Sequence, residues 1–132
     1  MKPSMPDKKL FEYAVLRVVP KVEREEFLNV GVVLYCAQTH FLKTNFQLDE
    51  KRLIAFSADL DLAELRKHLE SFQKISAGDP NGGPIAALDA ASRFRWLTAV
   101  RSTVVQTSKI HPGLCGDPET ALNNLMKEFA LG

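Results

Sequence analysis

Arginine, asparagine and hydroxyl residues interrupt the apolar runs of this chain and could form a binding site. Arg17 and Asn29 interrupt the first two runs. In the last run, Arg101 is followed directly by Ser102 and Thr103. Strand interiors favour β-branched and aromatic residues, so each polar side chain there needs an internal partner or a ligand. A guanidinium offers paired donors to a carboxylate or a phosphate. The residue types therefore predict an anion site.

Pairing of the first two strands would bring Arg17 and Asn29 together. In a symmetric hairpin Arg17 lies opposite Asn29, and Val15 lies opposite Gly31. Side chains at opposite positions have Cβ atoms about 5 Å apart. Gly31 would leave an open patch beside the pair, as a strand glycine often does where a ligand approaches. The last strand is expected to bring Arg101 to the same place.

Internal pairing is an alternative explanation of the same residues. Glu26, at the entrance of the second strand, either joins the site or pairs with Arg17 as a structural ion pair, with Asn29 bonded to the turn. Buried polar groups usually form hydrogen bonds within the protein, so we favour internal pairing over a ligand site. Arg101 could likewise be the partner of a glutamate, with Glu12, Glu25 and Glu26 as candidates. Both explanations stay open.

Catalytic chemistry has little support in the sequence. The hydroxyl residues belong to no nucleophile motif, and the histidines His40, His68 and His111 are scattered without zinc-type spacing. The glycine-rich residues 78–84 lack the spacing of a phosphate loop. We therefore expect no catalytic residue, no metal and no cofactor, and a protein that is more plausibly a binding module than an enzyme.

Single-stranded nucleic acid is a further candidate ligand. Phe94 and Trp96 alternate with Arg93 and Arg95, and aromatic rings beside cations can stack on bases. Against this, the only tryptophan of an amphipathic strand is more often part of a core, and the formal net charge is only +1. Nucleic acid is therefore an unfavoured partner, and no membrane partner is expected.

The apolar periodicity predicts the elements that position these residues. We expect strands at residues 10–19, 27–36, 41–48, 94–96 and 100–108, short helices at 49–57 and 85–92, and main helices at 61–77 and from Asp117 onward. Residues 111–113 are expected to turn the chain and Cys115 to lie in a loop. This order predicts an α+β fold with an antiparallel sheet of about four or five strands.

Length and composition predict one domain. The chain has 132 residues, 45% hydrophobic and 25% charged, which is typical of a globular protein with one core. We expect a disordered tail at residues 1–8 and a single domain at residues 9–132. Two cysteines, no signal peptide and no apolar run of roughly 20 residues favour a cytoplasmic protein with reduced thiols.

Several segments together resemble a family of small bacterial proteins known as domain of unknown function 3037. The segments are residues 13–20, 26–34, 94–97, 101–103 and the helix start at 117–119, and the resemblance spans about residues 10–129. It implies no activity, but it suggests a HipA-like kinase as a protein partner. The first hypothesis is therefore a non-catalytic binding or regulatory module acting through a protein partner. The alternatives are a nucleotide- or phosphate-binding protein or enzyme, and a single-stranded nucleic-acid binder; the oligomeric state stays open.

Overall fold

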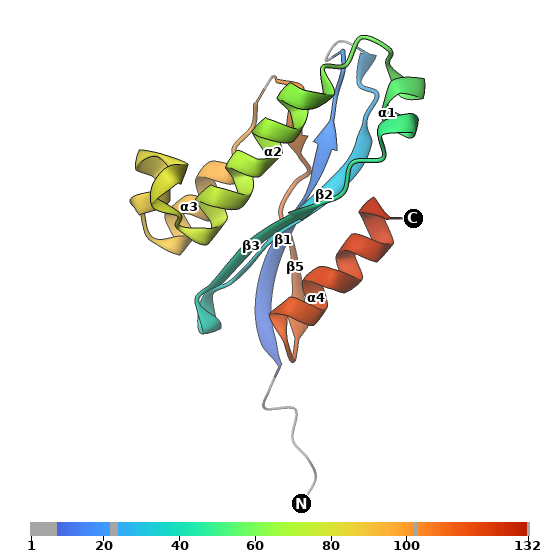
Figure 1. Ribbon diagram of the computed structural model, residues 1–132. Helices are drawn as coiled ribbons and strands as arrows, with labels where there is room; N and C mark the ends of the chain where they lie inside the picture. Colours follow the sequence, from blue (N-terminus) through green and yellow to red (C-terminus); the bar gives the residue numbers. More distant parts are fainter. Residues whose placement is uncertain (1–7, 22–23, 102, 132) are drawn as a thin grey trace, which may run out of the picture.

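The fold is an antiparallel sheet with helices on both faces, as the sequence predicts. A computed structural model describes residues 8–21, 24–101 and 103–131. Within these residues the strands are β1 (Lys9–Val18), β2 (Leu28–Cys36), β3 (Phe41–Phe46), β4 (Val105–Thr107) and β5 (His111–Cys115). The order is β3-β2-β1, and the far side of β1 pairs first with β5 and then with β4. β1 is therefore the central strand (Figure 1).

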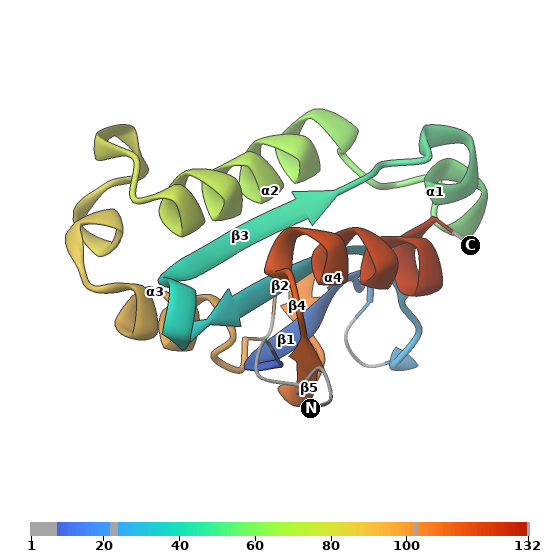
Figure 2. The same cartoon turned by 90° about the horizontal axis from the view of Figure 1, so that it is seen from below.

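Four α-helices cover the sheet in the described part of the chain. They are α1 (Glu50–Phe56), α2 (Leu62–Ala77), α3 (Ala90–Leu97) and α4 (Pro118–Leu125), which continues as a π-helical turn at Met126–Ala130. Short 3-10 turns lie at Ala37–Thr39, Pro80–Gly82 and Pro84–Ala87. In Figure 1, α2 and α3 lie on one side of the sheet and α4 on the other, and Figure 2 shows α2 running alongside β3. Within the described residues no helix is long and apolar enough to cross a bilayer.

Aspartate side chains start the α-helices. Asp49, Asp61, Asp89 and Asp117 each accept a hydrogen bond from the backbone N–H three residues further on, at 3.0–3.1 Å. Such caps satisfy N–H groups that have no partner within the helix. Gly78 ends α2 with φ of 69°, a conformation that suits glycine. These signals confirm the predicted helices at residues 49–57, 61–77 and 117 onward.

Each face of the sheet has its own apolar core. Leu16, Val18 and Val33 pack with Phe72 of α2 on one face. On the other face a second group packs with α4, comprising Phe11, Val32, Leu34, Cys36, Cys115, Leu122 and Met126. Because β1 and β2 bury side chains on both faces, they are mid-sheet strands, as their continuous apolar sequence predicts.

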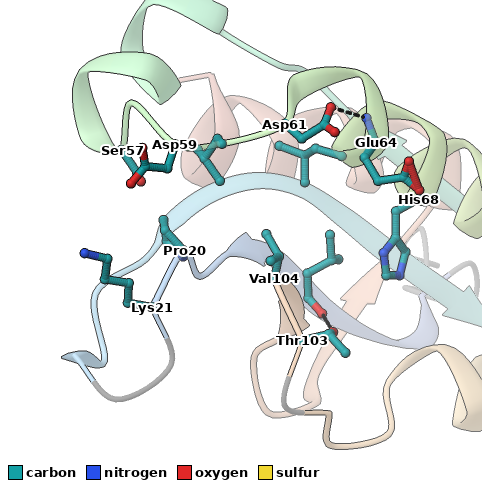
Figure 3. A pocket seen from close by; sticks show the side chains of 12 residues that line it. Pro20, Lys21, Ser57, Asp59, Asp61, Glu64, His68, Thr103 and Val104 are labelled. Atoms are coloured by element: carbon teal, nitrogen blue, oxygen red, sulfur yellow. Dashed lines mark hydrogen bonds between the residues drawn. The ribbon is translucent and has the colours of Figure 1, made fainter.

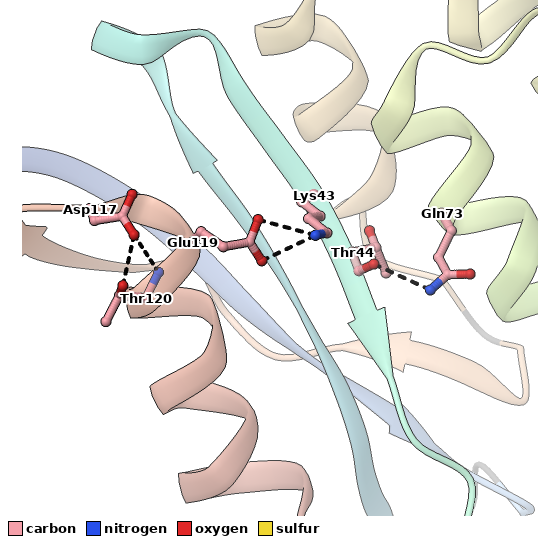
Figure 4. Close-up of polar contacts among 6 residues, drawn as sticks. All are labelled: Lys43, Thr44, Gln73, Asp117, Glu119 and Thr120. Atoms are coloured by element: carbon pink, nitrogen blue, oxygen red, sulfur yellow. Dashed lines mark hydrogen bonds and ion pairs between the residues drawn. The ribbon is translucent and has the colours of Figure 1, made fainter.

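Polar contacts from β3 connect the sheet to the helices on both sides. Lys43 binds the carboxylate of Glu119 in α4 at 3.1 Å. The next residue, Thr44, points to the opposite face, where its hydroxyl bonds Ser76 of α2. Gln73 donates to the Thr44 carbonyl at 3.4 Å. Figure 4 shows the contact of Lys43 with Glu119 and that of Gln73 with Thr44 on the two faces of the sheet. The alternation of side chains along β3 therefore joins both helical layers to one edge strand.

Four expectations about residues 94–115 are wrong. Residues 94–96 belong to α3, because Phe94 and Leu97, three residues apart, face the core together. Of the strand expected at residues 100–108, only Val105–Thr107 is a strand among the described residues. The turn expected at residues 111–113 is part of β5, where Pro112 is tolerated because β5 is an edge strand among those described. Cys115 accordingly ends a strand.

The expectation of a disordered tail at residues 1–8 falls almost entirely outside the described residues. Lys8 alone of that segment is described, and it is exposed. From Lys9 onward the chain is part of the central strand. The short helix expected at residues 85–92 is also corrected, since a 3-10 turn at Pro84–Ala87 is followed by the separate helix α3.

Candidate functional site

Arg17 and Asn29 lie opposite each other on β1 and β2. The pairing arises through a bulge: Leu16 is opposite Gly31 and Arg17 is opposite Asn29, so Val30 is the extra residue of β2. Val15 therefore faces Val32 and not Gly31, which corrects the register expected for a symmetric hairpin. The bulge brings the Asn29 side chain to the sheet face of Arg17, while Val30 packs in the core beneath α2.

Both side chains carry a buried polar atom that has no hydrogen-bond partner among the described residues. These atoms are Nε of Arg17, a donor, and Oδ1 of Asn29, an acceptor. Most buried polar atoms in proteins are paired, because leaving one unpaired costs about 1–3 kcal/mol. The structure thus brings together one unused donor and one unused acceptor at opposing positions of neighbouring strands.

Phe27 covers the Arg17 guanidinium. The Arg17 Cζ lies 4.0 Å from the centroid of the Phe27 ring, a cation–π contact. Phe27 precedes β2 and is 43% exposed, so its ring belongs to neither core. A surface hollow of about 300 Å³ lies beside the two residues, and its other walls come from Val19, Glu25 and Gln106. The cluster Arg17, Phe27 and Asn29 is called the hairpin site below.

Gly31 does not open a patch next to the hairpin site. A Cβ built at Gly31 would overlap the carbonyl oxygen of Asn45 and the Cβ of Phe46, both in β3. The glycine is therefore required by the close approach of the neighbouring strand, and not by a ligand. The expected open patch is absent at this position.

Glu26 pairs with a neighbour in the turn. Its carboxylate lies 3.8 Å from Nε of Arg24, and both side chains are more than 60% exposed. Such exposed pairs contribute little stability. The structure brings Glu26 to a polar hollow of about 210 Å³ shared with Lys21 and Asp59, and not to the guanidinium of Arg17.

Arg101 is held in a different part of the molecule, on the side of the sheet that α2 and α3 cover. It donates to the carbonyl oxygens of Trp96, Leu97 and Ala99, and its Cζ lies 4.5 Å from the Trp96 ring and 5.5 Å from the Phe72 ring. Partial burial lowers the pKa of its guanidinium. Because its donors bind carbonyls in the last turn of α3 and just after it, the role of Arg101 is to satisfy the C-terminal end of that helix. It does not join Arg17.

Thr103, the described hydroxyl residue after Arg101, does not reach the hairpin site either. The Thr103 hydroxyl donates to the carbonyl of Val105 at 2.7 Å, and its side chain lines a separate cavity. Ser102 lies outside the described residues. Of the described residues that were expected to form one site, the structure therefore brings together only Arg17 and Asn29. Phe27 joins them, and the sequence did not indicate it.

A comparison with known protein families shows the family of this chain. The family described as protein of unknown function (DUF3037) matches residues 13–130 of the 132-residue chain. The chain belongs to this family. Neither the curated proteins nor the solved structures contain a match. The hairpin site, α3 and α4 all lie within the matched part of this DUF3037 protein.

A cavity of about 470 Å³ in this DUF3037 protein was not indicated by the sequence. It lies between the end of β1, the α1–α2 connection, the first turns of α2 and the segment before β4 (Figure 3). Its lining includes His68, which the sequence did not connect with any site. Asp61 and Glu64, at the start of the predicted helix at residues 61–77, also line it. The lining comes from three stretches that are distant in sequence, residues 20–21, 57–68 and 103–105, so only the fold reveals the cavity.

The described residues form no candidate metal site. They contain no group of three His, Cys, Asp or Glu side chains placed to hold an ion. Cys36 and Cys115 are free and lie in the same core. Burial, with the neighbouring Cys36, raises the pKa of the Cys115 thiol, which keeps it protonated and disfavours a role as nucleophile.

Proposed function

We propose that this protein is a non-catalytic binding module that acts through a protein partner, and that the hairpin site contacts an extended segment of that partner. The single observation that carries this proposal is the adjacent unused donor and acceptor, Arg17 Nε and Asn29 Oδ1. A peptide group complements both, because its carbonyl accepts a hydrogen bond and its N–H donates one. The exposed Phe27 ring next to them supplies an apolar contact.

A phosphate fits the hairpin site less well than a peptide does. A phosphate ester offers acceptors but no donor for the Asn29 oxygen at neutral pH. The site also contains one guanidinium and not two, and Glu25 forms part of the wall of the hollow. A carboxylate near the bound phosphate would repel it. These features favour a peptide group over a phosphate group as the ligand.

The partner approaches as Phe27 moves aside. The two unpaired atoms are covered in the free protein, and the Phe27 ring lies directly over the guanidinium. Because this ring lies before β2 and outside both cores, its rotation disrupts neither. Binding then exchanges a cation–π contact for two hydrogen bonds to a peptide group.

A HipA-like kinase is the partner to test first, since the family resemblance suggests it. The bacterial cytoplasm is the proposed location, in keeping with the free thiols of Cys36 and Cys115. The experiment is co-purification of the kinase with wild type, Arg17→Met and Asn29→Val, with Asn45→Val as a matched control on neighbouring β3. We expect wild type and the control to retain the kinase and both site variants to lose it. Equal retention by all four proteins, or by none, would refute this proposal.

A further inference from the structure

The cavity beside His68 has the size and lining of a small-molecule site. Its volume is about 470 Å³, within the range of about 300–1,000 Å³ typical of ligand pockets. Leu60, Leu65 and Val104 form apolar walls. Leu65 is buried in the core, whereas Val104 is 42% exposed at the mouth of the cavity. The apolar part of a ligand could therefore contact Leu65 at the base of the cavity and Val104 at its mouth.

The walls of this cavity are held in place by backbone contacts. The Val104 carbonyl accepts from the Val19 N–H at 2.6 Å, which attaches the segment before β4 to the end of β1. On the other side, Asp61 accepts from the Glu64 N–H at 3.1 Å and fixes the start of α2. Both sides of the cavity are thus already formed without a ligand, which limits the entropy lost on binding.

The charged groups around the cavity favour a cation. Asp59, Asp61 and Glu64 contribute three carboxylates to the lining, and Lys21 contributes the one ammonium. None of these four side chains has an ion-pair partner among the described residues. Asp61 is explained by helix capping, but Asp59 precedes the cap and Glu64 keeps its carboxylate free. With three carboxylates and one ammonium, the lining has a formal charge of −2.

Glu64 and His68 form the polar end of the cavity. They are four residues apart on α2, and Figure 3 shows their side chains next to each other on the side that faces the cavity. Burial, and then the positive charge of Arg101, lower the pKa of His68, while Glu64 opposes this effect. A neutral imidazole offers a lone pair to a donor, and the carboxylate offers a counter-charge.

We propose that this cavity binds a small organic amine, with the ammonium group between Glu64 and His68 and the apolar body against Leu60, Leu65 and Val104. An ammonium group supplies donors for both acceptors and a charge that complements the carboxylates. An anion of the same size would instead meet three carboxylates. This site is separate from the hairpin site and does not depend on the proposed protein partner.

The test uses three ligands with nearly the same apolar body and different charge. The full chain is titrated with 2-phenylethylamine, 3-phenylpropionate and 2-phenylethanol while backbone amide resonances are recorded. We expect saturable shifts from the amine at residues 60–68 and 103–105, with half-saturation on the order of 1 mM for so small a ligand. The alcohol and the acid should bind more weakly. Absence of amine binding, equal or tighter binding of the acid, or shifts confined to other regions would each overturn the proposal.

Two variants and a control locate the ammonium. Glu64→Gln and Asp59→Asn each remove one carboxylate of the lining, and Glu70→Gln removes one from the exposed side of α2. We expect amine affinity to fall about fivefold in Glu64→Gln, because a charge-assisted hydrogen bond is lost, and to stay unchanged in Glu70→Gln. Asp59→Asn lies outside the helix and should reduce affinity without affecting α2. Equal affinity in wild type and both cavity variants would contradict the assignment.

Discussion

Arg17 Nε and Asn29 Oδ1 occupy opposing positions of two central strands, and both are buried without a hydrogen-bond partner among the described residues. A donor and an acceptor so placed would be expected to satisfy each other or to be replaced by apolar groups, unless another molecule uses them. The β2 bulge at Val30 creates this arrangement, because it brings Asn29 to the face of Arg17. A proposed role in binding a peptide therefore depends on one local irregularity of the sheet.

Removing the Asn29 amide is expected to stabilise the isolated protein. Asn29→Val replaces an unpaired buried acceptor with a β-branched residue, so the free energy of unfolding should rise by about 1 kcal/mol. The measurement is urea unfolding followed by circular dichroism, with Asn45→Val as the control for strand propensity. A decrease of similar size would mean that the Asn29 amide makes a stabilising contact.

Gly31 should tolerate no side chain. A Cβ there would overlap the Asn45 carbonyl of the paired strand, and backbone atoms cannot move aside as a flexible side chain can. We expect Gly31→Ala to lower the free energy of unfolding by about 2 kcal/mol or more. Gly116→Ala is the control, since a Cβ at Gly116 meets no atom within 4 Å. Equal stability of the two variants would refute the close approach of β3.

Arg101 is expected to support the fold and not a ligand. Its side chain binds three carbonyl oxygens at the end of α3, so Arg101→Met should lower the free energy of unfolding by about 1–3 kcal/mol. The control is Arg95→Met, because Arg95 belongs to α3, the helix whose end Arg101 binds, and makes one exposed side-chain hydrogen bond, to Ser92. If Arg101→Met left thermal stability unchanged, the arginine would be available for another role.

His68 predicts the direction of the pH dependence. Its pKa is lowered chiefly by burial, with Arg101 acting the same way and Glu64 opposing. The unfolded chain therefore takes up a proton before the folded chain does. The contribution of His68 to the free energy of unfolding is complete above the pKa of its imidazole in the unfolded chain. This contribution is lost as the pH falls through the lower pKa that the imidazole has in the folded chain. We expect stability to decrease as the pH falls below the ordinary histidine pKa of about 6.5, and to decrease less in His68→Gln.

The control for this titration is His40→Asn, since His40 is exposed with a positive φ of 54°, which asparagine accepts readily. It should reproduce the wild-type pH dependence. If His68→Gln and wild type lost stability in parallel over this range, burial of the imidazole would not be the cause.

Local signals made much of the fold predictable. Aspartates followed by apolar helical spacing marked α2 and α4, and Gly78 marked the end of α2, because caps depend on a few neighbouring residues. The runs of β1 and β2 indicated mid-sheet strands, since both faces are apolar. The opposition of Arg17 and Asn29 also followed from treating these strands as a hairpin.

The remaining features depend on tertiary structure. Phe94 and Trp96 alternate with arginines as in a strand, yet packing of Phe94 and Leu97 against the core and the Asp89 cap make this segment helical. The bulge at Val30 cannot be read from composition, because it reflects how two strands pair. Arg101 was expected near Arg17, but carbonyl groups at the end of α3 bind it on the other side of the sheet.

The most direct test of the proposed function measures stability and kinase binding on the same protein, Asn29→Val. If the unpaired amide is retained for a partner, the variant should be more stable than wild type by about 1 kcal/mol and should no longer co-purify with the HipA-like kinase. A variant that is less stable than wild type and still binds the kinase would contradict the account.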